Sequence, residues 1–136
     1  MHMVLMKFVL DASAFINASA LDVNEGDSYY TVSDVEEEIK DASSKGLLER
    51  LKASKALVFL SPSKEAIKIV EKAASRLGSI RHLSNTDIKV LALALDLKAT
   101  LISDDFTMQN VAMDLGISFE AVLRGKIKEK KRFRKI

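Results

Sequence analysis

Short apolar runs alternate with longer helical stretches along this sequence, and the alternation predicts both the elements and their order. The short runs are rich in β-branched and aromatic residues, so we expect strands at residues 7–10, 28–32, 56–60, 99–102 and 117–119. The stretches between them predict helices at residues 12–21, 33–43, 46–54, 62–77, 83–97 and 106–115. Apolar, non-alternating strands belong to a parallel sheet covered on both faces, so the predicted fold class is α/β.

Residues with special capping or backbone preferences support several of these boundaries. Ser33 and Glu36 have the spacing of a capping box, in which side chains bond free N–H groups at the helix start. Pro62 fits the first position of a helix, where its missing N–H is not needed. Gly78 and Gly116 fit helix ends, where a left-handed backbone conformation is common.

Three acidic residues lie at or just after the ends of predicted strands. Asp11 ends the first strand, and Asp104 and Asp105 follow the fourth. In parallel sheets, ligands bind at the carboxyl ends of strands where the strand order reverses, so these side chains are expected at a binding edge. Structural roles stay open, because Asp11 or Ser13 also suits the cap of the following helix, and adjacent aspartates suit a turn.

Helix phase singles out Glu38 among three consecutive glutamates. At about 100° per residue, Glu38 lies within about 60° of Val35 on the predicted buried face, which Ile39 and Ala42 share, and Glu37 points roughly the opposite way. Glu38 is therefore expected to face inward. The alternative is a boundary residue whose stem packs on the protein while its carboxylate reaches water.

Asp87 lies in the first turn of the predicted helix at 83–97. It has capping-box spacing from Ser84, and an acid in the first turn also suits the helix dipole. Asp87 nevertheless shares a helix face with the apolar residues Leu91 and Ala94. Helix capping and metal binding are compatible, so both roles stay open.

These acidic residues occupy four separate segments that the fold would bring to one edge of the sheet. Carboxylates at a buried edge are costly unless they are paired or bind a metal. Oxygen ligands suit hard cations, so one or two Mg²⁺ or Mn²⁺ ions are expected there. The pattern indicates metal-dependent hydrolysis of a phosphodiester, with metal bound by Asp11, Glu38, Asp87, Asp104 and Asp105.

Composition removes several other classes of site. The chain has 136 residues, close to the size of one domain, and its lack of cysteine excludes disulfides, thiolate zinc sites and a cysteine nucleophile. We therefore expect an intracellular, cytoplasmic protein. No apolar run is long enough to span a membrane. Neither His2 nor His82 has a nucleophile to pair with, and no glycine-rich phosphate loop is present.

Charge is distributed unevenly between the body of the chain and its C-terminal tail. The whole chain carries +2, and residues 124–136 hold eight basic residues and one acid, so the tail is +7 and residues 1–123 are −5. A basic tail on an acidic body suits binding to an anionic polymer, although a solvated tail or a linker is the alternative. The tail residues expected to bind RNA are Arg124, Lys126, Lys128, Lys130, Lys131, Arg132, Arg134 and Lys135.

Four sequence blocks together resemble the PIN-domain nucleases. They are FVLDASAFI, SDVEEEIKD, LSNTDIKVLALAL and LISDDFTMQNVA, and the likeness extends over nearly the whole chain to about Gly116. Within that family the chain is similar to the Nob-type endoribonucleases of archaea and eukaryotes, which mature the 3′ end of small-subunit ribosomal RNA. The Gln109-Asn110 pair is particular to that branch.

The resemblance implies a three-layer α/β/α PIN-like fold with a central parallel sheet and strand order 3-2-1-4-5. It implies that Ser13 supports the first catalytic acid, and Ser84 is expected to support Asp87 as its helix cap. The implied catalytic acids are Asp11, Glu38, Asp87 and Asp105, with Asp104 adjacent to the last of them.

We expect one PIN-like nuclease domain over residues 1–123, followed by the basic tail at 124–136. Nob-type proteins usually carry a C-terminal zinc ribbon, and this cysteine-free sequence has none. The tail is therefore either a disordered end or a linker to a module that is truncated here or absent from this member.

The expected activity is Mg²⁺- or Mn²⁺-dependent endonucleolytic cleavage of single-stranded RNA, with pre-ribosomal RNA or the small ribosomal subunit as partner. Two alternatives within the family stay open: a toxin-type PIN ribonuclease held by an antitoxin, and a PIN scaffold that binds RNA without cutting it. A receiver-type phosphorylation domain fits less well, because it would need its acidic pair at the first strand. A homodimer is also left open.

Overall fold

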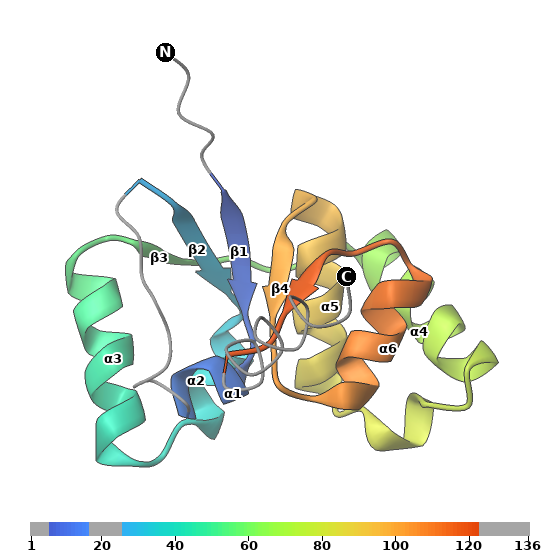
Figure 1. Ribbon diagram of the computed structural model, residues 1–136, viewed down its shortest axis with the longest axis horizontal. Coiled ribbons are helices and arrows are strands. Elements are labelled where there is room, and N and C mark those ends of the chain that lie inside the picture. Colours follow the sequence, from blue (N-terminus) through green and yellow to red (C-terminus); the bar gives the residue numbers. More distant parts are fainter. Residues whose placement is uncertain (1–5, 17–25, 123–136) are drawn as a thin grey trace, which may run out of the picture.

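The computed structural model describes residues 6–16 and 26–122, which form a five-stranded parallel sheet flanked by helices (Figure 1). The strand order is β3-β2-β1-β4-β5, which confirms the order that the resemblance implied. All strand pairs are parallel, but β2 and β3 lie on one side of β1 and β4 and β5 lie on the other. The order of strands therefore reverses between β1 and β4, and a binding edge is expected at the carboxyl ends of these two strands. The strands are β1 Lys7–Leu10, β2 Ser28–Thr31, β3 Leu57–Phe59, β4 Thr100–Ile102 and β5 Phe119–Glu120.

The helices connecting these strands form two groups. Figure 1 shows α1, α2 and α3 on one side of the sheet and α4, α5 and α6 on the other, which is the predicted three-layer α/β/α arrangement. The part of the first predicted helix beyond residue 16 lies outside the described residues. The bounds are α1 Ala12–Ile16, α2 Ser33–Glu38, α3 Ala42–Ala53, α4 Lys64–Arg76, α5 Asn85–Leu97 and α6 Phe106–Asp114, with a short 3₁₀ helix at Ile80–His82.

The helix predicted at residues 33–43 ends early. Ile39 has extended backbone angles, with φ −85° and ψ 115°, so α2 stops at Glu38. Asp41 then caps α3, because its carboxylate accepts hydrogen bonds from the Ser44 N–H at 2.9 Å and from the Ser44 hydroxyl at 2.8 Å. This cap satisfies backbone donors of a new first turn, and α3 therefore begins at Ala42 rather than at residue 46.

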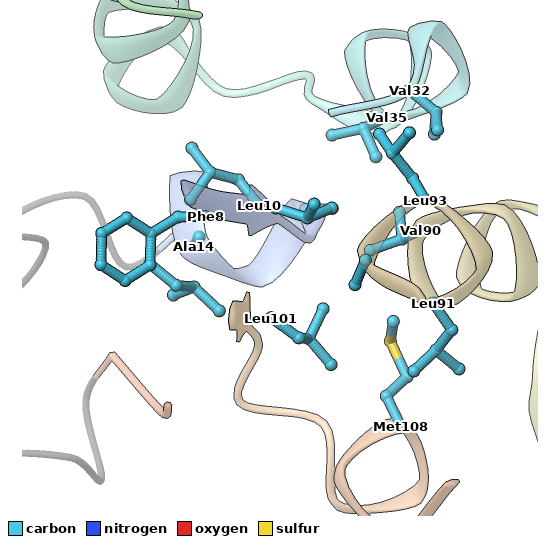
Figure 2. Packing of buried hydrophobic residues seen from close by; sticks show 14 of the residues in the cluster. Phe8, Leu10, Ala14, Val32, Val35, Val90, Leu91, Leu93, Leu101 and Met108 are labelled. Atoms are coloured by element: carbon cyan, nitrogen blue, oxygen red, sulfur yellow. The ribbon is translucent and has the colours of Figure 1, made fainter. Parts of the chain in front are cut away.

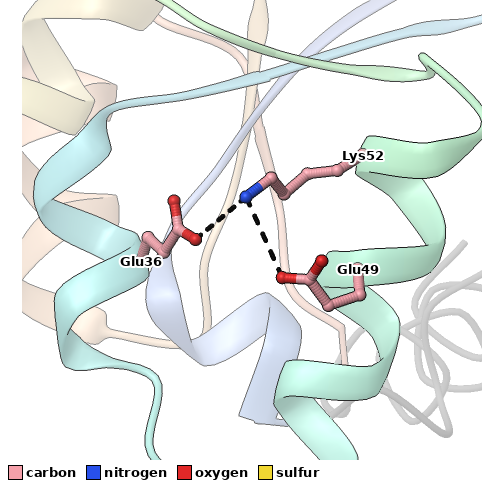
Figure 3. A network of polar contacts seen from close by, with 3 residues as sticks. All are labelled: Glu36, Glu49 and Lys52. Carbon is pink, nitrogen blue, oxygen red and sulfur yellow. Dashed lines mark hydrogen bonds and ion pairs between the residues drawn. The ribbon is translucent and has the colours of Figure 1, made fainter.

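The capping box predicted at Ser33 and Glu36 is wrong. Val32 occupies the N-cap position of α2, and no side chain caps that helix. Glu36 instead lies 3.1 Å from the ammonium of Lys52 on α3, and Glu49 lies 3.8 Å from the same ammonium (Figure 3). These three residues form an exposed network, called here the α2–α3 ion-pair network, which joins α2 to α3.

Pro62 is not the first residue of α4. Ser63 caps this helix by accepting a hydrogen bond from the Ala66 N–H at 3.1 Å, so Pro62 precedes the cap. Asp96 of α5 holds Ser63 in place, accepting from its N–H at 2.6 Å and from its hydroxyl at 2.8 Å. A contact distant in sequence thus fixes this helix start.

The predicted helix ends at two glycines are confirmed. Gly78 and Gly116 follow α4 and α6 with φ of 73° and 74°, a left-handed conformation that costs glycine little. The last predicted strand begins two residues late, at Phe119, because the Ile117 N–H still bonds the Ala112 carbonyl at 2.8 Å.

One apolar core fills the space between the sheet and its helices. Side chains from β1, β4, α2, α5 and α6 turn toward a common centre in Figure 2. α5 is buried along most of its length, including the consecutive residues 90–94, because it packs on β1 and β4 and also against α4. No helix in the described part of the chain is long and apolar enough to cross a membrane.

The register of the two central strands sets the position of the site. Leu10 of β1 pairs with Ile102 of β4, and the Asp11 N–H donates to the Ile102 carbonyl at 3.0 Å. The buried hydroxyl of Thr31 donates to the Leu10 carbonyl at 2.7 Å. The residues that follow β1 and β4, Asp11 and Ser103, are therefore held at the same level of the sheet.

Candidate active site

Asp11 is a buried carboxylate held by two hydroxyl groups. Its side chain is only 5% exposed, although it follows β1 at the edge of the sheet. Its Oδ2 accepts a hydrogen bond from the Ser103 hydroxyl at 2.8 Å and another from the Ser13 hydroxyl at 3.1 Å. Ser13 therefore contacts the first acid, as the resemblance implied, and Ser103 is a second supporting hydroxyl that the sequence did not indicate.

The same two serines fix the loop between β4 and α6. The Ser13 hydroxyl accepts a hydrogen bond from the Asp104 N–H at 3.0 Å, and the Ser103 hydroxyl accepts from the Asp105 N–H at 3.1 Å. Each serine thus donates to Asp11 and accepts from the backbone of one member of the acidic pair. The end of β1 and the start of the β4–α6 loop form one connected polar unit.

Asp104 and Asp105 point to different partners. Asp105 caps α6, because its Oδ1 accepts from the Thr107 N–H at 2.8 Å and the Met108 N–H at 3.2 Å. Asp104 accepts from the Val122 N–H at 2.7 Å, near the end of the described chain. The turn-and-cap role that the sequence left open for this pair is therefore present, and it orients the two carboxylates differently.

Asp87 joins this group from the start of α5. The predicted capping box is confirmed: the Ser84 hydroxyl accepts from the Asp87 N–H at 3.0 Å, and the Asp87 carboxylate accepts from the Ser84 N–H at 2.9 Å. Burial raises the pKa of Asp87, and the charge of Asp105 raises that pKa further. The cap orients Asp87 while its carboxylate stays within the electrostatic reach of a second carboxylate.

Electrostatics link Asp11 to the same group. Burial is the main cause that raises the pKa of Asp11, and the negative charge of Asp87 raises it further, whereas the hydrogen bond from Ser103 acts to lower it. Within residues 6–16 and 26–122, no lysine or arginine forms an ion pair with Asp11, Asp87 or Asp105. The structure therefore brings three predicted acids near one another without a compensating cation from these residues.

Glu38 is placed differently from the prediction. Its side chain is exposed at the last position of α2, and the inward orientation inferred from helix phase is wrong. The phase argument used Ile39 and Ala42 as part of the same helix, but the chain leaves the helix at Ile39. No hydrogen bond or ion pair in the described residues joins Glu38 to the other acids, so its role as a ligand stays a prediction.

The arrangement of the three grouped carboxylates fits a hard divalent cation in its donor chemistry. The available donors are carboxylate oxygens, which Mg²⁺ and Mn²⁺ prefer, and two of the three groups have pKa values raised by burial and mutual repulsion. As these side chains stand, no three acidic or histidine residues in the described segments close around one point. Each carboxylate instead accepts hydrogen bonds from nearby N–H or hydroxyl donors: Asp11 from Ser13 and Ser103, Asp87 from Ser84, and Asp105 from the first turn of α6.

Sequence reasoning missed two buried polar residues that build this site. Ser103 is fully buried, and its carbonyl accepts from the amide of Gln109 on α6 at 2.7 Å. The signal for Ser103 was a hydroxyl residue directly after a buried strand and before two aspartates. In the sequence Gln109 stands out only through the family resemblance, whereas in the structure its amide ties α6 to the loop that carries Asp105.

The basic residues expected to bind RNA lie outside the described residues, from Arg124 onward. Val122, which Asp104 holds, is the last described residue before them. Residues 124–136 begin two positions after it in sequence.

Comparison with known proteins gives a consistent family. Residues 8–97 match the PIN domain of ribonuclease. The sequence is 47% identical to Endoribonuclease Nob1 of Pyrococcus abyssi, over 88% of this chain and 71% of that protein. It is 33% identical to the 20S-pre-rRNA D-site endonuclease nob1 of Schizosaccharomyces pombe, over 74% of this chain but only 26% of that protein.

Toxin-type relatives are also similar. Ribonuclease VapC3 of Aeropyrum pernix is 38% identical, over 80% of this chain and 81% of its own length. Among solved structures, VapBC2 from Rickettsia felis bound to a promoter DNA fragment shares the fold, with a TM-score of 0.59 at 15% identity, over 85% of this chain and 98% of that one.

Proposed function

Because this chain belongs to the PIN domain family of ribonucleases, we propose that it cuts single-stranded RNA internally with a divalent cation, Mg²⁺ or Mn²⁺, and matures the 3′ end of small-subunit ribosomal RNA. One observation carries the catalytic part of the proposal. Asp11, Asp87 and Asp105 lie within electrostatic reach at the carboxyl edge of the sheet, and the described residues supply no cation to offset them. Burying such a group is costly unless a cation joins it.

The proposed roles of the residues follow from their contacts. Asp11, Asp87 and Asp105 would hold the cation, with Glu38 as the proposed fourth acid and Asp104 adjacent. A bound divalent cation would act as a Lewis acid, lowering the pKa of water and neutralising charge on the phosphate. Ser13 and Ser103 hold Asp11 in one orientation, and the caps at Ser84 and Asp105 fix the other carboxylates.

The RNA target is proposed from the relatives. One relative, the 20S-pre-rRNA D-site endonuclease nob1, is named for a ribosomal RNA precursor, and Endoribonuclease Nob1 shares the name Nob1 with it. A cleavage assay on precursor fragments of small-subunit ribosomal RNA tests this directly, with Mn²⁺ in one arm and a chelator in the other. We expect one dominant cut near the mature 3′ end, only in the metal arm. Binding without any cut in either arm would identify a non-cleaving scaffold instead.

Residues 1–123 are proposed as the nuclease domain and residues 124–136 as a basic arm that contacts phosphates. The acidic body would otherwise repel RNA, and the eight basic residues of the tail supply the opposite charge. Deleting residues 124–136 should flatten the salt dependence of binding by about 0.7 in log-log slope for each lost phosphate contact on a single strand. An unchanged slope would mean that the tail does not touch RNA.

A toxin-type ribonuclease is the second candidate, and a specific likeness favours it. The chain covers 81% of the length of Ribonuclease VapC3 at 38% identity. A toxin would be held by a small antitoxin partner. Purification from the source organism discriminates the two: a stoichiometric small protein that blocks cleavage favours the toxin, and association with precursor ribosomal particles favours ribosomal RNA maturation.

A further inference from the structure

The first turn of α6 exposes a large aromatic side chain directly beside the candidate active site. Phe106 is 67% exposed, although it immediately follows Asp105. At about 100° per residue, Asn110 and Met113 lie within about 40° of Phe106 on the same helix face. Asn110 is exposed, and Met113 is 65% exposed. The buried residues of this helix are Met108, Gln109, Val111 and Ala112.

The position of this exposed face is fixed relative to the carboxylates. Asp105 caps α6 through two backbone N–H groups, and its own N–H is held by the hydroxyl that also bonds Asp11. The amide of Gln109 ties the next turn of α6 to the same loop. Phe106 therefore cannot move far from the acids without breaking this polar unit.

Charge repulsion makes an uncharged surface useful at this place. The three grouped carboxylates repel the phosphates of an approaching RNA strand. From Phe106 to Met113, α6 carries no charged residue, and the acid that follows, Asp114, is paired with Arg76 of α4. Attraction to this face must therefore come from contacts that do not depend on charge, and stacking of bases on aromatic rings is such a contact.

We propose that Phe106 is a stacking platform for a base of single-stranded RNA next to the phosphate that is cut, and that Asn110 and Met113 extend this base-binding strip along α6. The inference rests on the proposed function. With a rise of about 1.5 Å per residue, the strip is about 10 Å long, which suits one or two nucleotides. A stable protein interface of about 800 Å² per partner needs a larger surface than three side chains provide.

The absence of tryptophan from the chain gives a direct probe. Phe106→Trp places one indole at the proposed platform, and its fluorescence should be quenched saturably by a single-stranded oligoribonucleotide in the presence of a chelator. Ile69→Trp is the matched control, because Ile69 is a half-exposed apolar residue on α4, in another part of the helical layer. It should show no saturable quenching over the same concentration range.

Affinity gives the second readout. Phe106→Ala should weaken binding of the same oligoribonucleotide at least about fivefold, the lower end of the effect of losing one stacked base, and Phe106→Trp should restore it. The loss should shrink when the oligomer carries abasic nucleotides, because those keep the phosphates and remove the bases. Ile69→Ala should bind like the parent.

The outcomes separate the platform from the function itself. A parent that binds and cuts RNA, with Phe106→Ala equal to it in affinity and quenching absent, would overturn the platform and leave the ribonuclease intact. A parent that neither binds nor cuts RNA would overturn both. If Phe106→Ala instead turns a dimer into a monomer while RNA affinity is unchanged, the face is an interface between two copies of the chain.

Discussion

Two acidic regions of this molecule differ in how their charges are balanced. On α2, Glu36 is partly exposed and pairs with Lys52, and a hollow of about 580 Å³ beside that helix is lined by lysines as well as glutamates. At the ends of β1 and β4, Asp11 is buried, its pKa is raised, and no described lysine or arginine pairs with it. α2 has three consecutive glutamates, yet the carboxylate without a nearby basic partner is Asp11, which has no acidic neighbour in sequence.

The difference shows that the number of acids in a segment does not identify a site. Exposed ion pairs contribute little to stability and need no further explanation. The buried carboxylate of Asp11 lies near the negative charge of Asp87, and no described lysine or arginine pairs with it to offset that electrostatic cost. Such a cost is commonly found where a fold is selected for chemistry, because active sites perturb the pKa values of their residues.

Replacing Asp11 with asparagine should have the largest effect. The substitution keeps the shape of the side chain and removes a charge that the cation needs, so RNA cleavage should fall by more than about 100-fold, beyond the range typical of outer-shell partners. Initial rates with saturating Mn²⁺ measure this. Glu37→Gln is the control, because it removes one negative charge from α2. Nearly unchanged cleavage by Asp11→Asn would reduce Asp11 to a structural residue.

The same substitution should not destabilise the metal-free protein near neutral pH. The pKa of Asp11 is raised in the folded state, so its ionised form opposes folding, and this cost is present above the raised pKa. It disappears as the pH falls and the folded protein takes up the proton. In chelator, the Tm of Asp11→Asn should equal or exceed that of the parent near neutral pH, and the difference should narrow in acid. A lower Tm near neutral pH would contradict this.

Removing the Ser103 hydroxyl should have an intermediate effect. Ser103→Ala leaves Asp11 with one hydroxyl and the Asp105 N–H without its partner, so cleavage should fall about 10- to 100-fold. The buried, unpaired groups should also cost about 1–3 kcal/mol of unfolding free energy. Chemical denaturation and cleavage rates measure the two effects. Ser75→Ala, which removes an exposed hydroxyl from α4, is the control and should lower neither.

Two neighbouring glutamates test whether α2 contributes to the site. Glu38→Gln and Glu37→Gln remove the same charge one residue apart. We predict at least about a tenfold loss of metal affinity or cleavage for Glu38→Gln, and only a few-fold change for Glu37→Gln. Equal effects would remove Glu38 from the site, and three acids from β1, α5 and α6 would remain.

Breaking the α2–α3 ion-pair network should have the smallest effect. Glu36→Gln removes the acid nearest Lys52, and an exposed pair of this kind contributes little to stability. Cleavage should match the parent, and urea denaturation should detect only a small change that added salt abolishes. A loss of cleavage would show that the two acidic regions are coupled.

The sequence predicted the layers of the fold because apolar residues set the order of strands and helices. Helix starts were less predictable. Asp41 caps α3 by accepting a hydrogen bond from Ser44. Ser63 caps α4, and the carboxylate that holds Ser63 belongs to Asp96, 33 positions away in the sequence. Local spacing alone favoured Ser33 and Pro62 instead.

The candidate site was predictable where chain position determines geometry. Asp11 and Asp105 follow adjacent strands, and Asp87 begins the helix that packs on both strands, so topology places them together. The hydrogen bond from Ser103 to Asp11 was not predictable, because it depends on the register between β1 and β4. The prediction that Glu38 faces inward was wrong because α2 ends at Glu38, whereas the helix-phase argument assumed that Ile39 and Ala42 belong to the same helix.

Metal binding by the grouped carboxylates is the central claim, and calorimetry of Mn²⁺ with the metal-free protein tests it most directly. The parent, Asp87→Asn and Glu37→Gln should be compared in one buffer near neutral pH and again in acid. We predict that Asp87→Asn binds Mn²⁺ at least about tenfold more weakly than the parent, and that Glu37→Gln binds like the parent. Parent affinity should also fall in acid, since protons compete for carboxyl groups with raised pKa. Equal Mn²⁺ affinity in all three proteins would contradict the account.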